Sequence, residues 1–427
     1  MKILKNYQNL IIFIFTIIFN FLIFVVNYLN YDSTRGTDFV KYRPNLDYFL
    51  YGLENNLQEQ GVGYFWVISQ FSKLKINSLK YSIDYEPLII NFGIQFGNFI
   101  FYVIGCVGVY KLLRFFEISR FHSLLIINFI AVFPPILGAR IILKPEIVAF
   151  AYLPWCVFAI YKFLFSKNFK YLFVIIPIVS ILLTSKASIS LMIALSLLIF
   201  IKKDFLSLKI IPIVILTLLV SLVLINESQV FNNKFLWEHT TPEGYDNVAP
   251  GNFIFTINND LMSNPYRDSQ ANSMIGILLV DTFGDYWQRY WYHQDAWQNN
   301  QHPGSLLNTR IGILLSLGFY VYLGLMLLKE QNKNLKKFGS LFLIGIATLL
   351  VNIFNIFPFL TKNFNPDKGD PIKTHYFSFL LVFSFIYILL KLLGNKKKLI
   401  SYLFLIFVFL FSLNIQKSIS FSEVKSN

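Results

Sequence analysis

The chain has 427 residues, of which 55% are hydrophobic and 47 are phenylalanine. Its mean hydropathy of +0.55 excludes a soluble globular protein, because a domain of this size could not bury so much apolar surface. The net charge of +14 would indicate nucleic-acid binding in a soluble protein. Here the lysines cluster in short loops between apolar segments, so the charge indicates membrane topology and we expect no nucleic-acid partner.

The first apolar segment, 9–28, follows Lys2 and Lys5 and resembles a signal peptide. It is long, however, and no small-residue cleavage site follows it, so we expect a retained helix. Cys106 and Cys156 lie inside later apolar runs. They are predicted to be packing residues rather than a disulfide.

Apolar segments of roughly membrane-spanning length recur along the chain. The predicted spans are 9–28, 87–113, 122–139, 146–165, 171–184, 187–201, 210–226, 307–328, 338–357, 374–393 and 398–414. With the N-terminus in the cytoplasm, every loop assigned to the inside carries Lys or Arg, as the positive-inside rule requires. The sequence therefore predicts an all-α polytopic membrane protein with about eleven spans.

The segment 171–201 decides the parity of this topology. As one helix it would be roughly 45 Å long at 1.5 Å per residue, against a hydrocarbon core of about 30 Å. Lys186 would then lie in mid-membrane, and the two Lys-rich ends would lie on opposite sides. Two short helices that meet at Thr184-Ser185-Lys186 avoid both problems. We expect their turn to line a recess open to the outer face.

Three polar segments fall outside in this topology: 30–86, 227–306 and the short 358–373. We therefore predict an N-terminal transmembrane module, 1–226, that includes the first outer loop. The large extracytoplasmic loop 227–306 follows, and a C-terminal transmembrane module, 307–427, completes the chain.

The first outer loop begins with GTDFVKYRPNLDYF, in which Asp38 lies about ten residues past the first helix. A carboxylate near the membrane surface can accept a proton from an attacking hydroxyl or hold a divalent metal. The alternative is a solvated loop acid or a helix cap. Lys41 and Arg43 are placed to orient this acid or to contact a phosphate.

A second segment, RIILKPEIVAFAYLPW, begins at Arg140. Pro145 suits the first turn of a helix and Glu146 its positive end, so capping explains Glu146. Capping does not explain Arg140 and Lys144, which lie outside against the charge bias. Cations at headgroup depth can neutralise a lipid phosphate, and we keep both interpretations open.

Two further outer positions carry lysine. Lys186, at the turn of the short helix pair, is either a snorkelling lysine or a ligand for phosphate or pyrophosphate, since intramembrane charges are often functional. Lys373, with His375 and Tyr376, opens the span 374–393. Binding of a lipid-linked phosphate and simple loop solubility both explain this group.

The second outer loop contains LLVDTFGDYWQRYWYHQDAWQ. On a helix, Asp281, Asp285 and Arg289 would share one face. Aromatic rings such as Trp287 pack on the apolar faces of sugars while acids hydrogen-bond the hydroxyls. An interfacial aromatic belt is the alternative. A di-metal site is disfavoured, because no ligand pattern such as HExxH accompanies the acids.

These segments together resemble the GT-C superfamily of integral membrane glycosyltransferases, which includes the protein O-mannosyltransferases and the lipid A aminoarabinose transferases. The resemblance rests on the loop-one acid Asp38, the Lys144-Pro145-Glu146 turn, the Thr184-x-Lys186 turn and the aromatic outer loop before the last spans. The chain departs from the mannosyltransferase pattern of adjacent Asp-Glu, because Phe39 follows Asp38.

The resemblance implies a polyprenyl-phosphate sugar donor and a lipid, glycan or protein acceptor. It implies that Asp38 is the catalytic base, and Glu146 is the second candidate catalytic carboxylate. The candidates for the donor phosphate are Arg140, Lys144, Lys186 and Lys373. The candidates for substrate binding are Arg43, Asp281, Asp285, Trp287, Arg289, His375 and Tyr376. No cofactor is specified, and assistance by Mg²⁺ or Mn²⁺ stays open.

The composition, rich in Ile, Asn, Lys and Phe, favours a bacterial cell-envelope protein in the inner membrane, with its site facing the periplasm. One alternative is a polysaccharide polymerase or ligase, whose early Gly-x-Asp pattern Gly36 and Asp38 fit loosely. The few arginines of the second outer loop favour the glycosyltransferase. A transporter or flippase of lipid-linked sugars would predict internal symmetry, which the sequence does not show.

Overall fold

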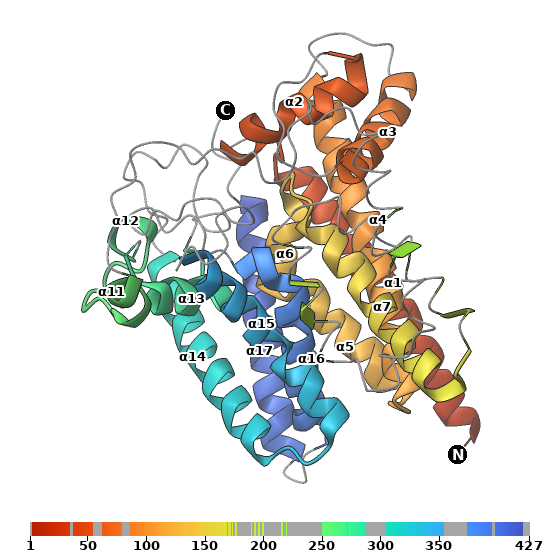
Figure 1. Ribbon diagram of the computed structural model, residues 1–427, viewed down its shortest axis with the longest axis vertical. Coiled ribbons are helices and arrows are strands. Elements are labelled where there is room, and N and C mark those ends of the chain that lie inside the picture. Colours follow the sequence, from red (N-terminus) through yellow and green to blue (C-terminus); the bar gives the residue numbers. More distant parts are fainter. Residues whose placement is uncertain are drawn as a thin grey trace. The chain divides into compact units, whose positions relative to one another are not determined.

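The computed structural model describes most of the chain as α-helix (Figure 1). The described residues are 2–34, 37–53, 62–78, 86–168, 170–171, scattered positions from 173 to 219, 250–270, 272–286, 305–353, 374–394 and 398–421. They contain no β-strand. This confirms the predicted all-α class for the part of the chain that the structure describes.

The chain divides into two compact units, which are treated separately below. The first unit comprises Met1–Tyr31, Asn128–Ala139 and Thr240–Asn427. The second comprises Asp32–Ile127 and Arg140–His239. The helices α5 (Arg120–Val132) and α6 (Pro134–Ile141) contribute to both units.

The first unit contains the helices at the two ends of the chain. They are α1 (Lys2–Asn30), α11 (Pro250–Phe255), α12 (Arg267–Gln270), α13 (Met274–Phe283), α14 (Ser305–Lys329), α15 (Lys333–Ile353), the 3₁₀ helix η4 (Thr374–Phe377), α16 (Ser378–Leu393) and α17 (Lys398–Phe421). The second unit contains α2 (Thr37–Tyr51), α3 (Val62–Ser78), α4 (Glu86–Phe115) and α7 (Glu146–Ser166).

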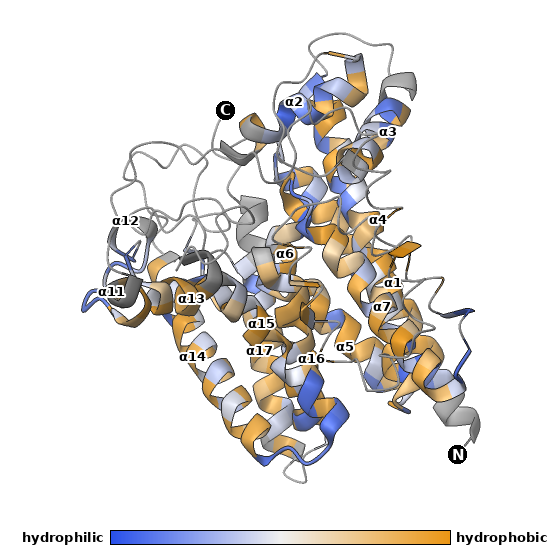
Figure 2. Ribbon diagram, viewed as in Figure 1, coloured by the Kyte–Doolittle hydropathy of each residue, from blue (hydrophilic) through white to orange (hydrophobic). Residues whose placement is uncertain are grey.

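Four helices in the described part of the chain are long and apolar enough to cross a membrane (Figure 2). Their candidate spans are Tyr7–Asn30, Glu86–Phe115, Glu146–Ser166 and Leu306–Lys329. Each coincides closely with a predicted span. The predicted span 122–139 corresponds to α5 and α6, a pair bent by 61° that forms a fifth candidate. The bend occurs at Pro134 and Pro135, because proline cannot continue a helix from the preceding turn.

The structure does not confirm the remaining predicted spans as full membrane crossings. The spans 338–357, 374–393 and 398–414 fall on helices, but α16 and the apolar part of α17 are shorter than a full span. The spans 171–184, 187–201 and 210–226 lie mostly outside the described residues. The structure thus supports a membrane protein with four or five spanning helices, and the number eleven stays a prediction.

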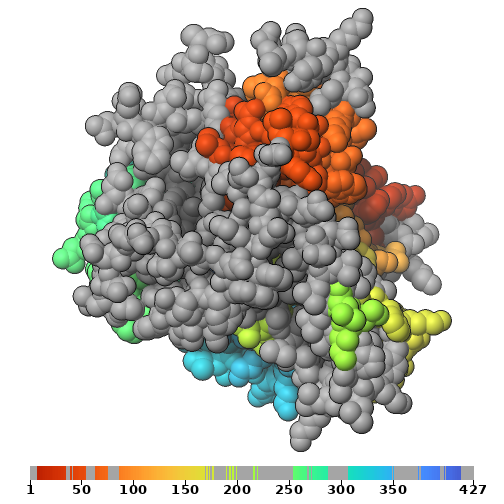
Figure 3. Space-filling model, turned by 45° about the horizontal axis from the view of Figure 1, so that its top comes forward, coloured from red at the N-terminus to blue at the C-terminus, as the bar shows by residue number. Residues whose placement is uncertain are grey.

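The two predicted outer loops contain helices of their own. Segment 30–86 holds α2 and α3, whose exposed surface is seen in the red-orange and orange atoms towards the top of Figure 3. Segment 227–306 holds α13, a buried apolar helix of ten residues that packs on α14. A run of this length is too short to span a bilayer and is typical of a core helix.

In the first unit, α1 exposes most of its apolar surface and buries a polar stripe of Thr16, Asn20 and Asn27. Asn20 Nδ2 donates to Asn128 Oδ1 of α5 at 3.3 Å, and Asn128 Nδ2 donates to Thr16 Oγ1 at 3.1 Å. Amides that bond across helices stabilise packing in lipid, where water offers no competing partner. This polar contact holds α1 on α5.

In the second unit, α4 lies between α3 and α7 (Figure 1). Glycine allows the close approach on both sides. A Cβ at Gly93 would lie 1.9 Å from Ser72 Oγ on α3. A Cβ at Gly105 would lie 2.5 Å from Phe150 Cε1 and 2.7 Å from the Phe150 carbonyl oxygen on α7. The backbones of the three helices therefore pack in direct contact.

We expect Gly105→Ala to lower the free energy of unfolding by about 1–3 kcal/mol, the usual cost of overpacking a filled interior. The added methyl group would meet the Phe150 backbone, which cannot rotate away. Gly318→Ala is the matched control, because nothing lies within 4 Å of a Cβ at Gly318 in the middle of α14. Unfolding of both variants in mixed detergent would test this. Equal stability of the two would contradict the close packing of α4 on α7.

Candidate functional site: a buried charged turn

The charged segment identified in the sequence forms the turn from α6 to α7. Arg140 lies in the last turn of α6, Pro145 is the N-cap of α7, and Glu146 is its first residue. Glu146 thus lies at the positive end of the helix, as predicted. The side chains of Arg140, Lys144 and Glu146 are buried, with relative exposures of 2%, 0% and 0%.

Side chains from two neighbouring segments hold the backbone of this turn. Asn98 of α4 donates from Nδ2 to the carbonyl oxygens of Arg140 and Ile142, at 2.8 and 2.9 Å. Ser33 Oγ donates to the carbonyl oxygen of Ile141 at 2.6 Å. Three consecutive carbonyls therefore accept hydrogen bonds from side chains. The last carbonyls of a helix have no intrahelical partner, and these side chains satisfy the carbonyls at the end of α6 and just beyond it.

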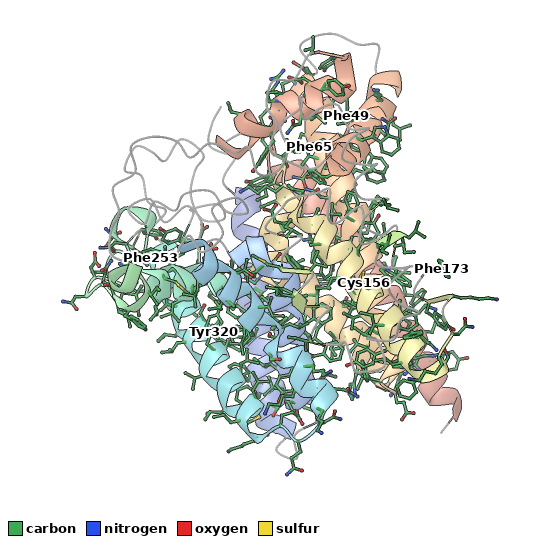
Figure 4. All side chains as sticks on the ribbon, in the orientation of Figure 1. Phe49, Phe65, Cys156, Phe173, Phe253 and Tyr320 are labelled. Carbon is green, nitrogen blue, oxygen red and sulfur yellow. The ribbon has the colours of Figure 1, made fainter. Side chains whose placement is uncertain are left out.

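Tyr64 of α3 completes the arrangement. The residue that follows it in the sequence, Phe65, is labelled in Figure 4. The Tyr64 hydroxyl donates to Asn98 Oδ1 at 2.9 Å and accepts from the Lys144 N–H at 3.1 Å. Burial raises the pKa of the Tyr64 phenol, and the negative charge of Glu146 acts in the same direction. The phenol therefore stays protonated and acts as a donor.

The guanidinium of Arg140 lies over an aromatic ring. Its Cζ is 4.7 Å from the centroid of Tyr102, which stacks on Phe150 at 5.8 Å. Arginine tolerates such burial better than lysine, because its charge is delocalised and weakly hydrated. The contact orients Arg140 between α4 and α7.

The turn concentrates positive charge. Arg140 and Lys144 contribute two positive charges and Glu146 one negative charge, so the three residues carry a net charge of +1. Buried charges are costly to hold and interact more strongly than exposed ones. Arginine and lysine are side chains that commonly bind phosphate, although here both also have interactions within the protein.

Arg43 has carboxylate partners that the sequence analysis did not identify. Its Nε lies 3.2 Å from Asp47 Oδ2, and its Nη2 lies 2.9 Å from Glu86 Oε1. Tyr51 also donates to Glu86, at 3.1 Å. Burial raises the pKa of Asp47, and the positive charge of Arg43 opposes that shift. These contacts join α2 to the start of α4, and a substrate-binding role for Arg43 stays a prediction.

The structure does not place Asp281 and Asp285 on one helical face, and Arg289, the third residue of that predicted face, lies outside the described residues. The helix α13 ends at Phe283, and Gly284 follows in an extended conformation (φ −105°, ψ −154°). Asp285 therefore lies beyond the helix, where it is 2% exposed. Asp281 instead accepts hydrogen bonds from Thr374, the first residue of η4.

Several predicted site residues lie outside the description. Lys186, Trp287, Arg289 and Lys373 are not among the described residues. Asp38, His375 and Tyr376 lie in the helices α2 and η4, but their side chains are not described. The charged turn and Asp281 belong to different units. The convergence of all these groups on one outer cavity stays a prediction.

Metal binding would require a group of His, Cys, Asp or Glu side chains that lie close together. Among the described residues there is no group of three or more His, Cys, Asp and Glu that could hold a metal ion. The two cysteines are buried and free, as predicted, and Cys156 is labelled on α7 in Figure 4. Assistance by Mg²⁺ or Mn²⁺ therefore stays an open expectation.

Sequence reasoning missed Tyr64, Asn98 and Ser33. For Asn98 a signal was present, because Asn91, Gln95 and Asn98 recur at helical spacing within an otherwise apolar span. All three are buried. Gln95 donates to Ser33 Oγ at 2.7 Å, and Asn91 accepts from the Ser33 N–H at 2.9 Å. Nothing local in the sequence distinguished Tyr64 from the other tyrosines.

Comparison with known proteins gives no relative on which to base a function: no family model, no curated protein and no solved structure matches the chain.

Proposed function

We propose that the protein is an integral membrane glycosyltransferase that moves a sugar from a polyprenyl-phosphate donor to an acceptor on the extracytoplasmic face. The observation that carries the proposal is the buried turn of Arg140, Lys144 and Glu146 at the start of α7. The acceptor is a lipid, a glycan or a protein. The proposed location is a bacterial inner membrane.

The length of α7 supports a position of the charged turn at the outer boundary of the hydrocarbon core. From Glu146 to Ser166 there are twenty residue steps, or about 30 Å at 1.5 Å per step. This equals the thickness of a hydrocarbon core. If Lys162 and Lys167 mark the cytoplasmic side, the charged turn lies at the outer boundary. Lipid phosphates lie at this depth.

Burial of the turn supports a role in binding and constrains it. Exclusion of water strengthens the attraction of Arg140 and Lys144 for a phosphate. Because both side chains are buried, a donor reaches them only when a covering segment moves. The proposal therefore includes a donor-induced opening of the outer surface.

The proposed reaction is a single displacement. The acceptor hydroxyl attacks the anomeric carbon of the sugar while Asp38 takes its proton. The bond from the anomeric carbon to the phosphate oxygen breaks, and polyprenyl phosphate leaves with both bonding electrons. Arg140 and Lys144 offset the charge of the leaving phosphate, and attack opposite the leaving group inverts the anomeric carbon. Positioning and electrostatics supply most of the rate.

The test is sugar transfer in proteoliposomes from a panel of radiolabelled polyprenyl-phosphate sugars. Lys144→Met is expected to reduce transfer by about 10²–10³-fold, the usual effect of losing one preorganised partner of a developing charge. Lys162→Met is the matched control, because Lys162 lies on the same helix at its other end and stacks on Phe115 at 5.3 Å. This control should transfer at the wild-type rate.

Two results would overturn the proposal. One is the absence of transfer from every monophosphate donor by the wild type, which would favour a polymerase or a transporter. The other is a folded Lys144→Met variant that transfers sugar as fast as the wild type. Size-exclusion chromatography establishes that a Lys144→Met variant with reduced transfer is folded, because a change at a buried charge can also destabilise the protein.

A further inference from the structure

We propose that Asp281 is a positioning residue that fixes the start of α16, rather than a direct ligand of the sugar. The consequence for donor binding rests on the proposed function, whereas the positioning itself does not. The inference concerns α13, α14 and η4, which all belong to the first unit.

The contact is dense and buried. The Thr374 N–H donates to Asp281 Oδ2 at 2.7 Å. The Thr374 hydroxyl lies 2.8 Å from the same Oδ2 and 2.9 Å from the Asp281 carbonyl oxygen. Asp281 is 8% and Thr374 2% exposed. Hydrogen bonds to a carboxylate are short and about twice as strong as neutral ones.

Asp281 lies in the last turn of α13, and hydrogen bonds to α14 hold this turn in place. Thr282 Oγ1 donates to the Leu278 carbonyl and lies 2.9 Å from the hydroxyl of Tyr320, which is labelled on α14 in Figure 4. The Phe283 N–H donates to Ser316 Oγ at 3.1 Å. Two residues of α14 thus hold the end of α13. The carboxylate that receives Thr374 is therefore held in place.

The hydrogen bonds between Thr374 and Asp281 set the position of η4, which contains the predicted substrate-binding residues His375 and Tyr376. Successive Cα atoms are 3.8 Å apart, so the backbone of His375 must follow wherever Thr374 is held. Lys373 precedes Thr374 in the sequence, outside the described residues. The contacts of Asp281 with Thr374 use one carboxylate oxygen, Oδ2, and the Asp281 carbonyl oxygen. Three hydrogen-bond contacts to one residue favour a positioning role for Asp281 over a ligand role.

The first test is the rate of maleimide labelling of a cysteine introduced by His375→Cys. The native cysteines are buried, so the wild type gives the background. Adding Thr374→Ala or Asp281→Ala should raise the labelling rate by about tenfold or more, as loss of charge-assisted hydrogen bonds allows. Thr374→Ser is the matched control, because it keeps the hydroxyl and should label within about twofold of His375→Cys alone.

The second test uses the native His375 background and the Michaelis constant for the polyprenyl-phosphate sugar. Thr374→Ala is expected to raise donor KM by about tenfold with kcat nearly unchanged, and Thr374→Ser to restore it. An effect on stability alone would lower the amount of active protein without changing KM. Such a result would overturn the positioning role in catalysis.

The remaining outcomes are also decisive. Labelling in the Asp281→Ala variant at the rate of His375→Cys alone would overturn the docking. If Asp281→Ala fails to fold, Thr374→Pro decides the question, because it removes both the hydroxyl and the backbone donor. If the wild type transfers no sugar, the proposed function fails, and the labelling rates still show whether Thr374 docks on Asp281.

Discussion

Asp38→Asn is expected to slow sugar transfer by about 10²–10⁴-fold, the usual contribution of a general base. Asparagine has nearly the same shape as aspartate but cannot take a proton from the acceptor hydroxyl. Binding of the donor should stay near the wild-type level, because the proposal assigns the phosphate to other residues. Transfer in proteoliposomes gives the rate, and retention of radiolabelled donor gives the binding.

The same segment offers a matched control in Asp32→Asn. Asp32 Oδ1 accepts hydrogen bonds from the N–H and hydroxyl of Thr34, at 2.9 and 2.5 Å. An asparagine oxygen can accept both, so this variant should transfer at the wild-type rate. An Asp38→Asn variant as active as Asp32→Asn would remove Asp38 from the mechanism. Loss of donor binding together with transfer would instead assign Asp38 to the binding of the donor.

Local signals explain which elements were predictable. The start of α7 at Glu146 followed from Pro145 and from an acid in the first turn, both of which act within one helical turn. The spans near α1, α4 and α14 followed from long apolar runs alone. The ten-residue helix α13 was missed, because polar and aromatic residues on both sides hide a run too short to be a span. Its end at Phe283 depends on Gly284, which the helical spacing of the acids did not reveal.

The sequence identified the charged residues of the site but not the residues that hydrogen-bond its backbone. Arg140 and Lys144 stood out because they oppose the charge bias of an outer turn. Their burial, and the hydrogen bonds from Asn98 and Tyr64, depend on segments more than forty residues apart in the chain. No local pattern encodes such pairings. Glu86, one partner of Arg43, was missed for the same reason, since it is distant in sequence from α2. The other partner, Asp47, lies four residues from Arg43, at a helical spacing that a local pattern does reveal.

Asn98→Leu is expected to lower the free energy of unfolding by several kcal/mol and to abolish most transfer. The substitution removes the bonds to the carbonyls of Arg140 and Ile142 and to the hydroxyl of Tyr64. Each buried group left without a partner costs about 1–3 kcal/mol. Within a membrane-spanning helix, water cannot replace the lost bonds. Unfolding in mixed detergent gives the stability, and transfer in proteoliposomes the activity.

Tyr64→Phe separates the two effects, because it keeps Asn98 on the turn. It removes only the bonds of the phenol to Asn98 Oδ1 and the Lys144 N–H. We expect a smaller loss of stability than for Asn98→Leu, and an increase in donor KM because Lys144 is less firmly held. If Asn98→Leu were as stable as Tyr64→Phe and transferred sugar normally, the turn would not depend on α4. The buried cations would then be an element of packing, and the phosphate site would have to lie elsewhere.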